Sequence, residues 1–202
     1  MNLAAAILHL KQDNKLRAIV ETTAVPDFTP SRKVYFDLLD SIVSQQLSTK
    51  VATVIFNRFR ALFPDSYPHP ELLTAFPIEQ LRSVGLSNQK AAYLQNVAAF
   101  SLQHDLENHG WDAMSDEEII TFLTQIKGVG KWTAQMILMF TVGRPDVFPV
   151  DDLGIQQAMT WLYGLDEKDK KIKNKMIELA EPWRPYRTFA SRYLWRWKDS
   201  AT

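Results

Sequence analysis

The stretch of the chain that decides its fold reads Leu123-Thr-Gln-Ile-Lys-Gly-Val-Gly-Lys-Trp-Thr-Ala134. An apolar helical pattern stops before Gly128, the two glycines turn the chain, and a second helix is predicted to begin at about Lys131. The N-terminus of that second helix presents unpaired backbone N–H groups, which suit a phosphate. A plain glycine-linked helical hairpin has the same pattern, so the hairpin alone does not establish nucleic-acid binding.

Helical periodicity continues on both sides of this hairpin. Ser115 and Glu118 read as a capping box, and Gly85 and Gly164 read as glycines that end helices. No segment alternates with period two over the length of a strand, so we predict an all-α protein. Apolar residues recur at steps of three and four within 36–47, 51–62, 91–98, 119–123, 137–140, 155–162 and 176–179, and the last helix is predicted over 186–197.

Composition excludes several kinds of chemistry. The 202 residues contain no cysteine, which excludes disulfides, thiol nucleophiles and cysteine-ligated iron–sulfur clusters. Twenty-three basic residues balance 23 acidic ones, and this neutrality argues mildly against a protein that wraps nucleic acid non-specifically. Apolar runs are too short to span a membrane, and the N-terminus lacks the basic residues of a signal peptide, so we expect an intracellular protein.

A second informative stretch reads Gly143-Arg-Pro-Asp-Val-Phe-Pro-Val-Asp-Asp-Leu-Gly-Ile155. Two aspartates at the start of a helix are ordinarily capping residues, because side-chain oxygens accept the first backbone N–H groups. A helix N-terminus also favours the charged form of a carboxylate. Such a fixed negative charge can stabilise the oxocarbenium character that develops when a glycosidic bond breaks. The loop therefore supports either a plain cap or a catalytic carboxylate.

Together the hairpin and the proline loop resemble the helix-hairpin-helix (HhH-GPD) DNA glycosylase superfamily, and most closely its 3-methyladenine glycosylase II subgroup. The segments at 42–48, 85–94 and 182–187 carry the same resemblance, which runs over residues 36–197. Helix-hairpin-helix motifs also occur in polymerases, ligases and nucleases, so the hairpin indicates DNA contact and the aspartate loop indicates the chemistry.

The resemblance implies a two-lobed, all-α core without the N-terminal β-rich domain of some relatives. One lobe is expected over residues 33–148, with the hairpin at about 118–141. Residues 1–32 and 149–202 are expected to form the other. The cleft between the lobes is expected to hold Trp132 and Asp152.

By the same match Asp152 is the catalytic carboxylate, and Asp151 is structural and caps the helix. Trp132 stands where bifunctional relatives have the lysine that cleaves the strand, so the match predicts no β-lyase activity. An indole also attracts a cationic base. The implied reaction is hydrolysis of the N-glycosidic bond of alkylated purines such as 3-methyladenine and 7-methylguanine, flipped out of duplex DNA, to leave an abasic site. These leaving bases already carry a positive charge, so no general acid is needed.

The remaining site residues follow from the match. Gln46, with Gln45 beside it, is expected to fill the gap left by the flipped base, and Lys90 to contact phosphate. Met136 and Arg192 depart from the aromatic pocket of many members, which puts the base preference in doubt. The expected DNA-binding residues are Gln45, Gln46, Ser87, Lys90, Lys127, Gly128, Val129, Gly130, Lys131 and Thr133, the base pocket is Trp132, Met136 and Arg192, and the backbone carbonyls of Thr124, Ile126 and Val129 would hold a monovalent cation.

No cofactor is expected; a structural Na⁺ or K⁺ at the hairpin is the one ion that the resemblance allows. The expected partner is double-stranded DNA with alkylated bases, bound by a monomer without membrane contact, in the cytoplasm or nucleoid, or in the nucleus of a eukaryote. Three alternatives remain open from the sequence: a glycosylase for oxidised, deaminated or mismatched bases, a non-catalytic protein that binds DNA lesions, and a purely structural helical protein.

Overall fold

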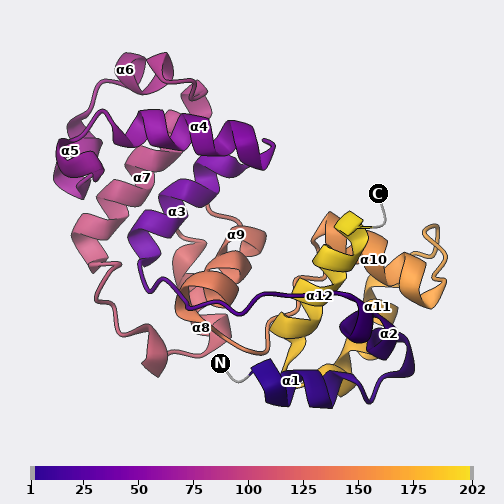
Figure 1. Ribbon diagram of the computed structural model, residues 1–202. Coiled ribbons are helices and arrows are strands. Elements are labelled where there is room, and N and C mark those ends of the chain that lie inside the picture. Colours follow the sequence, from indigo (N-terminus) through magenta and orange to yellow (C-terminus); the bar gives the residue numbers. More distant parts are fainter. Residues whose placement is uncertain (1–2, 201–202) are drawn as a thin grey trace. The chain divides into compact units, whose positions relative to one another are not determined.

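The computed structural model describes residues 3–200, and every regular element among them is a helix (Figure 1), which confirms the all-α prediction. The α-helices are α1 (Leu3–Leu10), α2 (Asn14–Thr22), α3 (Val34–Ser44), α4 (Thr49–Arg60), α5 (Pro70–Ala75), α6 (Ile78–Ser83), α7 (Asn88–His104), α8 (Asp116–Leu123), α9 (Lys131–Met136), α10 (Leu153–Tyr163), α11 (Ile172–Ala180) and α12 (Arg187–Ser200). Three 3₁₀ turns, η1 (Pro64–Ser66), η2 (Trp111–Ala113) and η4 (Glu181–Trp183), and one π-helical segment, η3 (Ile137–Val142), complete them. Over residues 3–200, no helix is both long and apolar enough to cross a bilayer.

The chain divides into two compact units, which are described separately. One combines Met1–Pro30 with Leu138–Thr202, and the other is Ser31–Ile137. The sequence placed residues 138–148 with the hairpin lobe, whereas their contacts lie with the C-terminal helices. Thr188 explains part of this: its hydroxyl donates to the Arg144 carbonyl at 2.7 Å and accepts from the Val147 N–H at 3.0 Å.

The unit Ser31–Ile137 is built around α7, which packs against α3 and α5. In Figure 1, α7 lies alongside α3 in this unit. Ser87 caps α7 by accepting the Lys90 N–H at 3.2 Å. The capping box of Ser115 and Glu118 at the start of α8 is also confirmed. The fully buried apolar side chains here include Leu38, Leu39 and Ile42 of α3 and Leu94 and Val97 of α7.

In the other unit, α12 packs against α10 and α2. Two helices, α1 and α2, begin the chain in this unit, and Asp13 is the N-cap of α2. Its Oδ1 accepts the backbone N–H groups of Lys15 and Leu16 at 2.9 and 3.0 Å. Its Oδ2 accepts the Tyr163 hydroxyl at 2.7 Å and the Trp183 indole N–H at 3.1 Å. One carboxylate therefore joins α2 to α10 and η4.

Asp13 should make the stability of this unit depend on pH. Burial acts to raise the pKa of Asp13, but the hydrogen bonds from Leu16, Tyr163, Trp183 and Lys15 together lower it below its usual value. Because the pKa of Asp13 is lower in the folded state, its carboxylate stabilises the fold at every pH above the pKa of the unfolded state, which is about 4. This stabilisation is lost as the pH falls through the pKa of the folded state.

We expect Asp13→Asn to lower the free energy of unfolding by about 1 kcal/mol at pH 7, with partial exposure screening the interaction. The difference from wild type should shrink towards pH 3. Urea unfolding at both pH values measures it, and exposed Glu167→Gln serves as the control. A difference that stays constant down to pH 3 would contradict the role of charge.

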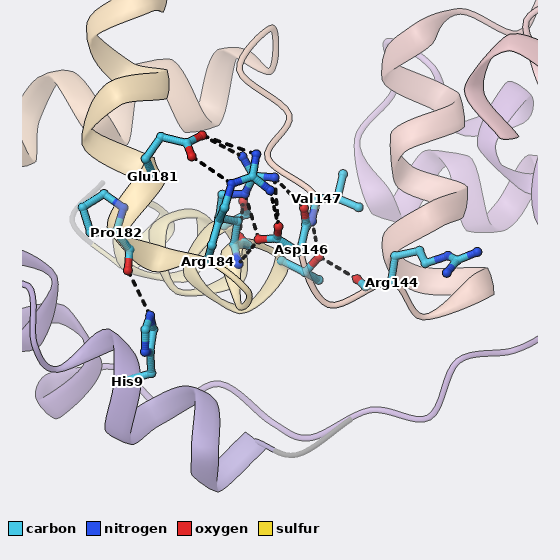
Figure 2. Close-up of polar contacts among 10 residues, drawn as sticks. His9, Arg144, Asp146, Val147, Glu181, Pro182 and Arg184 are labelled. Atoms are coloured by element: carbon cyan, nitrogen blue, oxygen red, sulfur yellow. Dashed lines mark hydrogen bonds and ion pairs between the residues drawn. The ribbon is translucent and has the colours of Figure 1, made fainter. Parts of the chain in front are cut away.

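A cluster of ion pairs holds the proline loop that precedes Asp152. Arg184 donates to Asp146 Oδ2 at 2.6 Å and Arg187 donates to Asp146 Oδ1 at 2.8 Å, and Glu181 accepts from Arg184 at 2.8 Å (Figure 2). The Arg187 side chain is only 12% exposed, so its pair with Asp146 is largely shielded from water. The cluster holds the proline loop against α12 and η4.

Candidate functional site

The predicted hairpin is present, with α8 ending at Leu123 and α9 beginning at Lys131. Gly128 has φ +110°, and a Cβ added to it would lie 2.3 Å from Cγ of Tyr93 on α7. Only glycine fits at that point, for reasons both of backbone conformation and of space. The Asn96 side chain also donates to the Lys127 carbonyl at 3.0 Å. The turn of the hairpin is therefore fixed against α7.

Along the hairpin, the two lysines predicted to meet DNA, Lys127 and Lys131, are exposed, whereas Val129 and Thr133 are buried. The Ile126 carbonyl accepts the Val129 N–H at 2.9 Å, which leaves its second lone pair for another partner. No group of three or more histidine or acidic side chains among residues 3–200 is placed to hold a metal ion. A monovalent cation on the carbonyls of Thr124, Ile126 and Val129 stays a prediction.

A cavity of about 620 Å³ lies in the unit Ser31–Ile137, between the end of α3 and the start of α9. It brings together several residues that the sequence singled out separately, and it omits Met136 of the expected base pocket. It also adds three polar residues of α3 that sequence reasoning missed. The lining residues are Asp40, Ser41, Ser44, Gln45, Gln46, Leu47, Gly130, Trp132 and Thr133. The missed signal is that Asp40, Ser41 and Ser44 share one face of α3, directly before the glutamines.

The glutamine segment follows the end of α3 in a strained turn, since Gln46 has φ +59°. The Lys90 ammonium donates to the carbonyls of Val43 and Gln45 at 2.7 and 2.8 Å. Burial lowers the pKa of Lys90. Lys90 therefore satisfies carbonyls that the helix end leaves without partners. The phosphate contact expected of Lys90 stays a prediction.

Asp152 is the N-cap of α10. Its Oδ1 accepts the Ile155 N–H at 2.9 Å and the Trp195 indole N–H at 2.8 Å. The expectation that Asp151 caps this helix was wrong: Asp151 pairs with Lys173 at 2.7 Å. The Asp152 N–H donates to the Pro149 carbonyl at 2.9 Å in a turn, so the helix begins one residue later than expected.

Trp195 on α12 is a site residue that sequence reasoning missed. A Cβ on Gly154 would lie 3.0 Å from Cδ1 of Trp195 and 3.1 Å from Oδ1 of Asp152. The indole reaches the carboxylate because residue 154 has no side chain. No local pattern predicts this contact, since it joins residues 43 positions apart in the chain.

Arg192, expected in the base pocket, is buried with 9% exposure. Its Nη2 donates to the Pro26 carbonyl, and its guanidinium carbon lies 4.3 Å from the centre of the Phe28 ring. Burial lowers the pKa of Arg192. The arginine also lines a smaller cavity of about 230 Å³ with Pro26 and Trp195. Much of the guanidinium is therefore engaged by the segment before α3.

Comparison with known proteins shows which family this chain resembles. The model of the HhH-GPD superfamily of base excision DNA repair proteins matches residues 39–185. DNA-3-methyladenine glycosylase 1 of Schizosaccharomyces pombe is 35% identical over 205 residues, which cover 96% of this chain and 87% of that protein. YfjP of Bacillus subtilis is 34% identical over 187 residues, which cover 90% of this chain but 64% of that protein. A solved structure of S. pombe 3-methyladenine DNA glycosylase in complex with abasic DNA matches with a TM-score of 0.81 and 33% identity, covering 95% of each chain.

Proposed function

Because the chain belongs to the HhH-GPD superfamily of base excision DNA repair proteins, we propose that it is a monofunctional DNA glycosylase that removes alkylated purines from duplex DNA. The observation that carries the proposal is the placement of Asp152. Two N–H donors, one from the start of α10 and one from Trp195, hold its Oδ1 in position. A carboxylate fixed in this way is suited to stabilise positive charge at a sugar carbon.

In the proposed reaction, the bond between the sugar and the base breaks as oxocarbenium character develops, and the Asp152 carboxylate stabilises that charge. The pair of bonding electrons leaves with the base, which is already cationic in 3-methyladenine or 7-methylguanine. The leaving group therefore becomes neutral without a proton from the protein. Water then adds to the sugar carbon and loses a proton, which leaves an abasic site.

The absence of strand cleavage follows from Trp132. An indole cannot form the covalent imine with the opened sugar that a lysine amine forms, so no β-elimination step begins at this position. Trp132 is 40% exposed and lines the large cavity, where its ring can bind a cationic base.

We propose that DNA docks on the N–H groups of the hairpin with Lys127 and Lys131 beside them, that Gln46 fills the space of the flipped nucleotide, and that a Na⁺ or K⁺ ion sits on the hairpin carbonyls. The exposed positions of both lysines support this arrangement. The protein would act as a monomer on chromosomal DNA, in the nucleoid or in the nucleus.

The proposed function is tested with duplex DNA treated with a methylating agent. We expect the protein to release 3-methyladenine or 7-methylguanine, and the DNA to show strand breaks only after alkali. Breaks without alkali would contradict the monofunctional assignment. Binding to methylated DNA without any release would instead favour a non-catalytic lesion-binding protein.

Trp195 gives a prediction about the positioning of Asp152. Trp195→Phe keeps the ring but removes the N–H donor, so we expect single-turnover base release to slow by about tenfold with DNA binding unchanged. Trp161→Phe, at an indole that is 47% exposed, is the matched control. Base release at the wild-type rate in Trp195→Phe would reduce Trp195 to a packing role.

A further inference from the structure

The cavity that contains Trp132 also contains a carboxylate. Asp40 lines it together with Ser41 and Ser44, all from α3. Ser44 follows Asp40 by one helical turn on the same face of α3, and a hydrogen bond from its side chain acts to lower the pKa of Asp40. The mechanism proposed for Asp152 makes no use of this second carboxylate.

Asp40 borders the cavity, and burial and neighbouring charged groups act on its carboxylate. Burial and the like charge of Asp37 raise the pKa of Asp40, against the opposing effects of Ser44 and Arg60. The Arg60 guanidinium is held elsewhere: its Nε donates to the Ser66 carbonyl at 3.0 Å, and the group lies 5.3 Å from the centre of the Phe36 ring. The charge of Arg60 therefore lowers the pKa of Asp40, while its guanidinium contacts Ser66 and Phe36.

A negative charge close to the hairpin is unfavourable for general DNA binding, because it repels phosphates. It is favourable only for a ligand that brings positive charge into the cavity. Trp132 shares that preference, since the face of an indole attracts cations. Asp40 and Trp132 thus form a pair with one electrostatic preference, in a cavity of about 620 Å³ that is large enough for a purine.

On the basis of the proposed glycosylase activity, we propose that Asp40 is a specificity residue: its carboxylate accepts a hydrogen bond from the amino edge of the flipped base and selects purines that carry a positive charge. Ser44 positions the carboxylate, and the Trp132 ring covers the base. Asp40 would bind the substrate and would take no part in breaking the glycosidic bond.

Two duplexes separate charge from shape. One carries a 2′-fluorinated 7-methylguanine nucleotide, which is cationic and resists hydrolysis. The other carries its 7-deaza analogue, which has the same outline and the same amino edge but no charge. We expect wild type to bind the cationic duplex about tenfold more tightly, since hydrogen bonds to charged groups are the stronger ones. Asp40→Asn, which removes the charge but keeps the size of the side chain, should bring the ratio of the two dissociation constants close to 1.

Asp65→Asn is the matched control, because it removes one negative charge from an exposed turn of the same unit that does not line the cavity. It should keep the wild-type ratio. Equal binding of both duplexes by wild type, or an unchanged ratio in Asp40→Asn, would overturn the role of Asp40. Release of methylated bases by wild type is measured alongside. If wild type releases no methylated base, the proposed function is wrong. If it releases base but Asp40→Asn keeps the wild-type ratio of dissociation constants, only the inference about Asp40 is wrong.

Discussion

Replacing Asp152 with asparagine is expected to slow release of methylated bases by at least about a thousandfold, while DNA binding stays within about twofold of wild type. Asparagine keeps an oxygen that can accept the N–H groups of Ile155 and Trp195, so the local geometry should survive. What disappears is the negative charge that the developing oxocarbenium requires. Single-turnover release and equilibrium binding on the same methylated duplex measure the two effects separately.

Asp151 provides the control one residue away. Its pair with Lys173 is exposed, with side-chain exposures of 47% and 52%, and such pairs contribute little to stability. Asp151→Asn should therefore leave base release within about twofold of wild type. If Asp151→Asn loses base release to the same extent as Asp152→Asn, the assignment of the catalytic role to Asp152 is wrong.

Gly128→Ala should have the largest effect on the stability of the unit Ser31–Ile137, and we expect it to lower the free energy of unfolding by about 3 kcal/mol. Two causes add. The backbone has φ +110°, which a residue with a Cβ rarely adopts, and the new methyl group would overlap the Tyr93 ring, 2.3 Å from Cγ. The decrease in Tm, measured by calorimetry, reports the loss of stability. We also expect the variant to bind DNA more weakly.

Gly130→Ala distinguishes this effect from a general need for glycine in the hairpin. Nothing lies within 4 Å of a Cβ at residue 130, and its φ is −92°, so we expect a loss below about 1 kcal/mol. Adding Tyr93→Ala to Gly128→Ala should relieve the overlap but not the backbone strain. If the double variant loses as much stability as the sum of the two single changes, or more, Tyr93 is not the obstacle.

The parts of the fold predicted from the sequence are those that depend on local signals. The hairpin, the capping box at Ser115 and the glycine that ends α10 at Gly164 all follow from residue type and spacing within a few positions. The position of the α10 cap was missed by one residue, because the choice between two adjacent aspartates depends on a turn with Pro149.

The contacts that the sequence did not predict join segments far apart in the chain. Trp195 reaches Asp152 across 43 positions, and the Lys90 ammonium reaches the end of α3 across 45 and 47 positions. The contacts of Arg192 with Pro26 and Phe28 also escape prediction, because that segment has no helical pattern, and the place of Arg192 in the base pocket stays a prediction. Hydrophobic periodicity gives each helix its buried face and does not state which partner that face will meet.

The absence of a side chain at Gly154 should couple the evolution of positions 154 and 195. A Cβ at residue 154 would lie 3.0 Å from the indole and 3.1 Å from the Asp152 carboxylate, so these side chains would have to shift by a few tenths of an ångström. A lineage that gains a methyl group at 154 while it keeps tryptophan at 195 would therefore disturb the hydrogen bond to Asp152. Descendants of this sequence that keep tryptophan at 195 should favour glycine at 154.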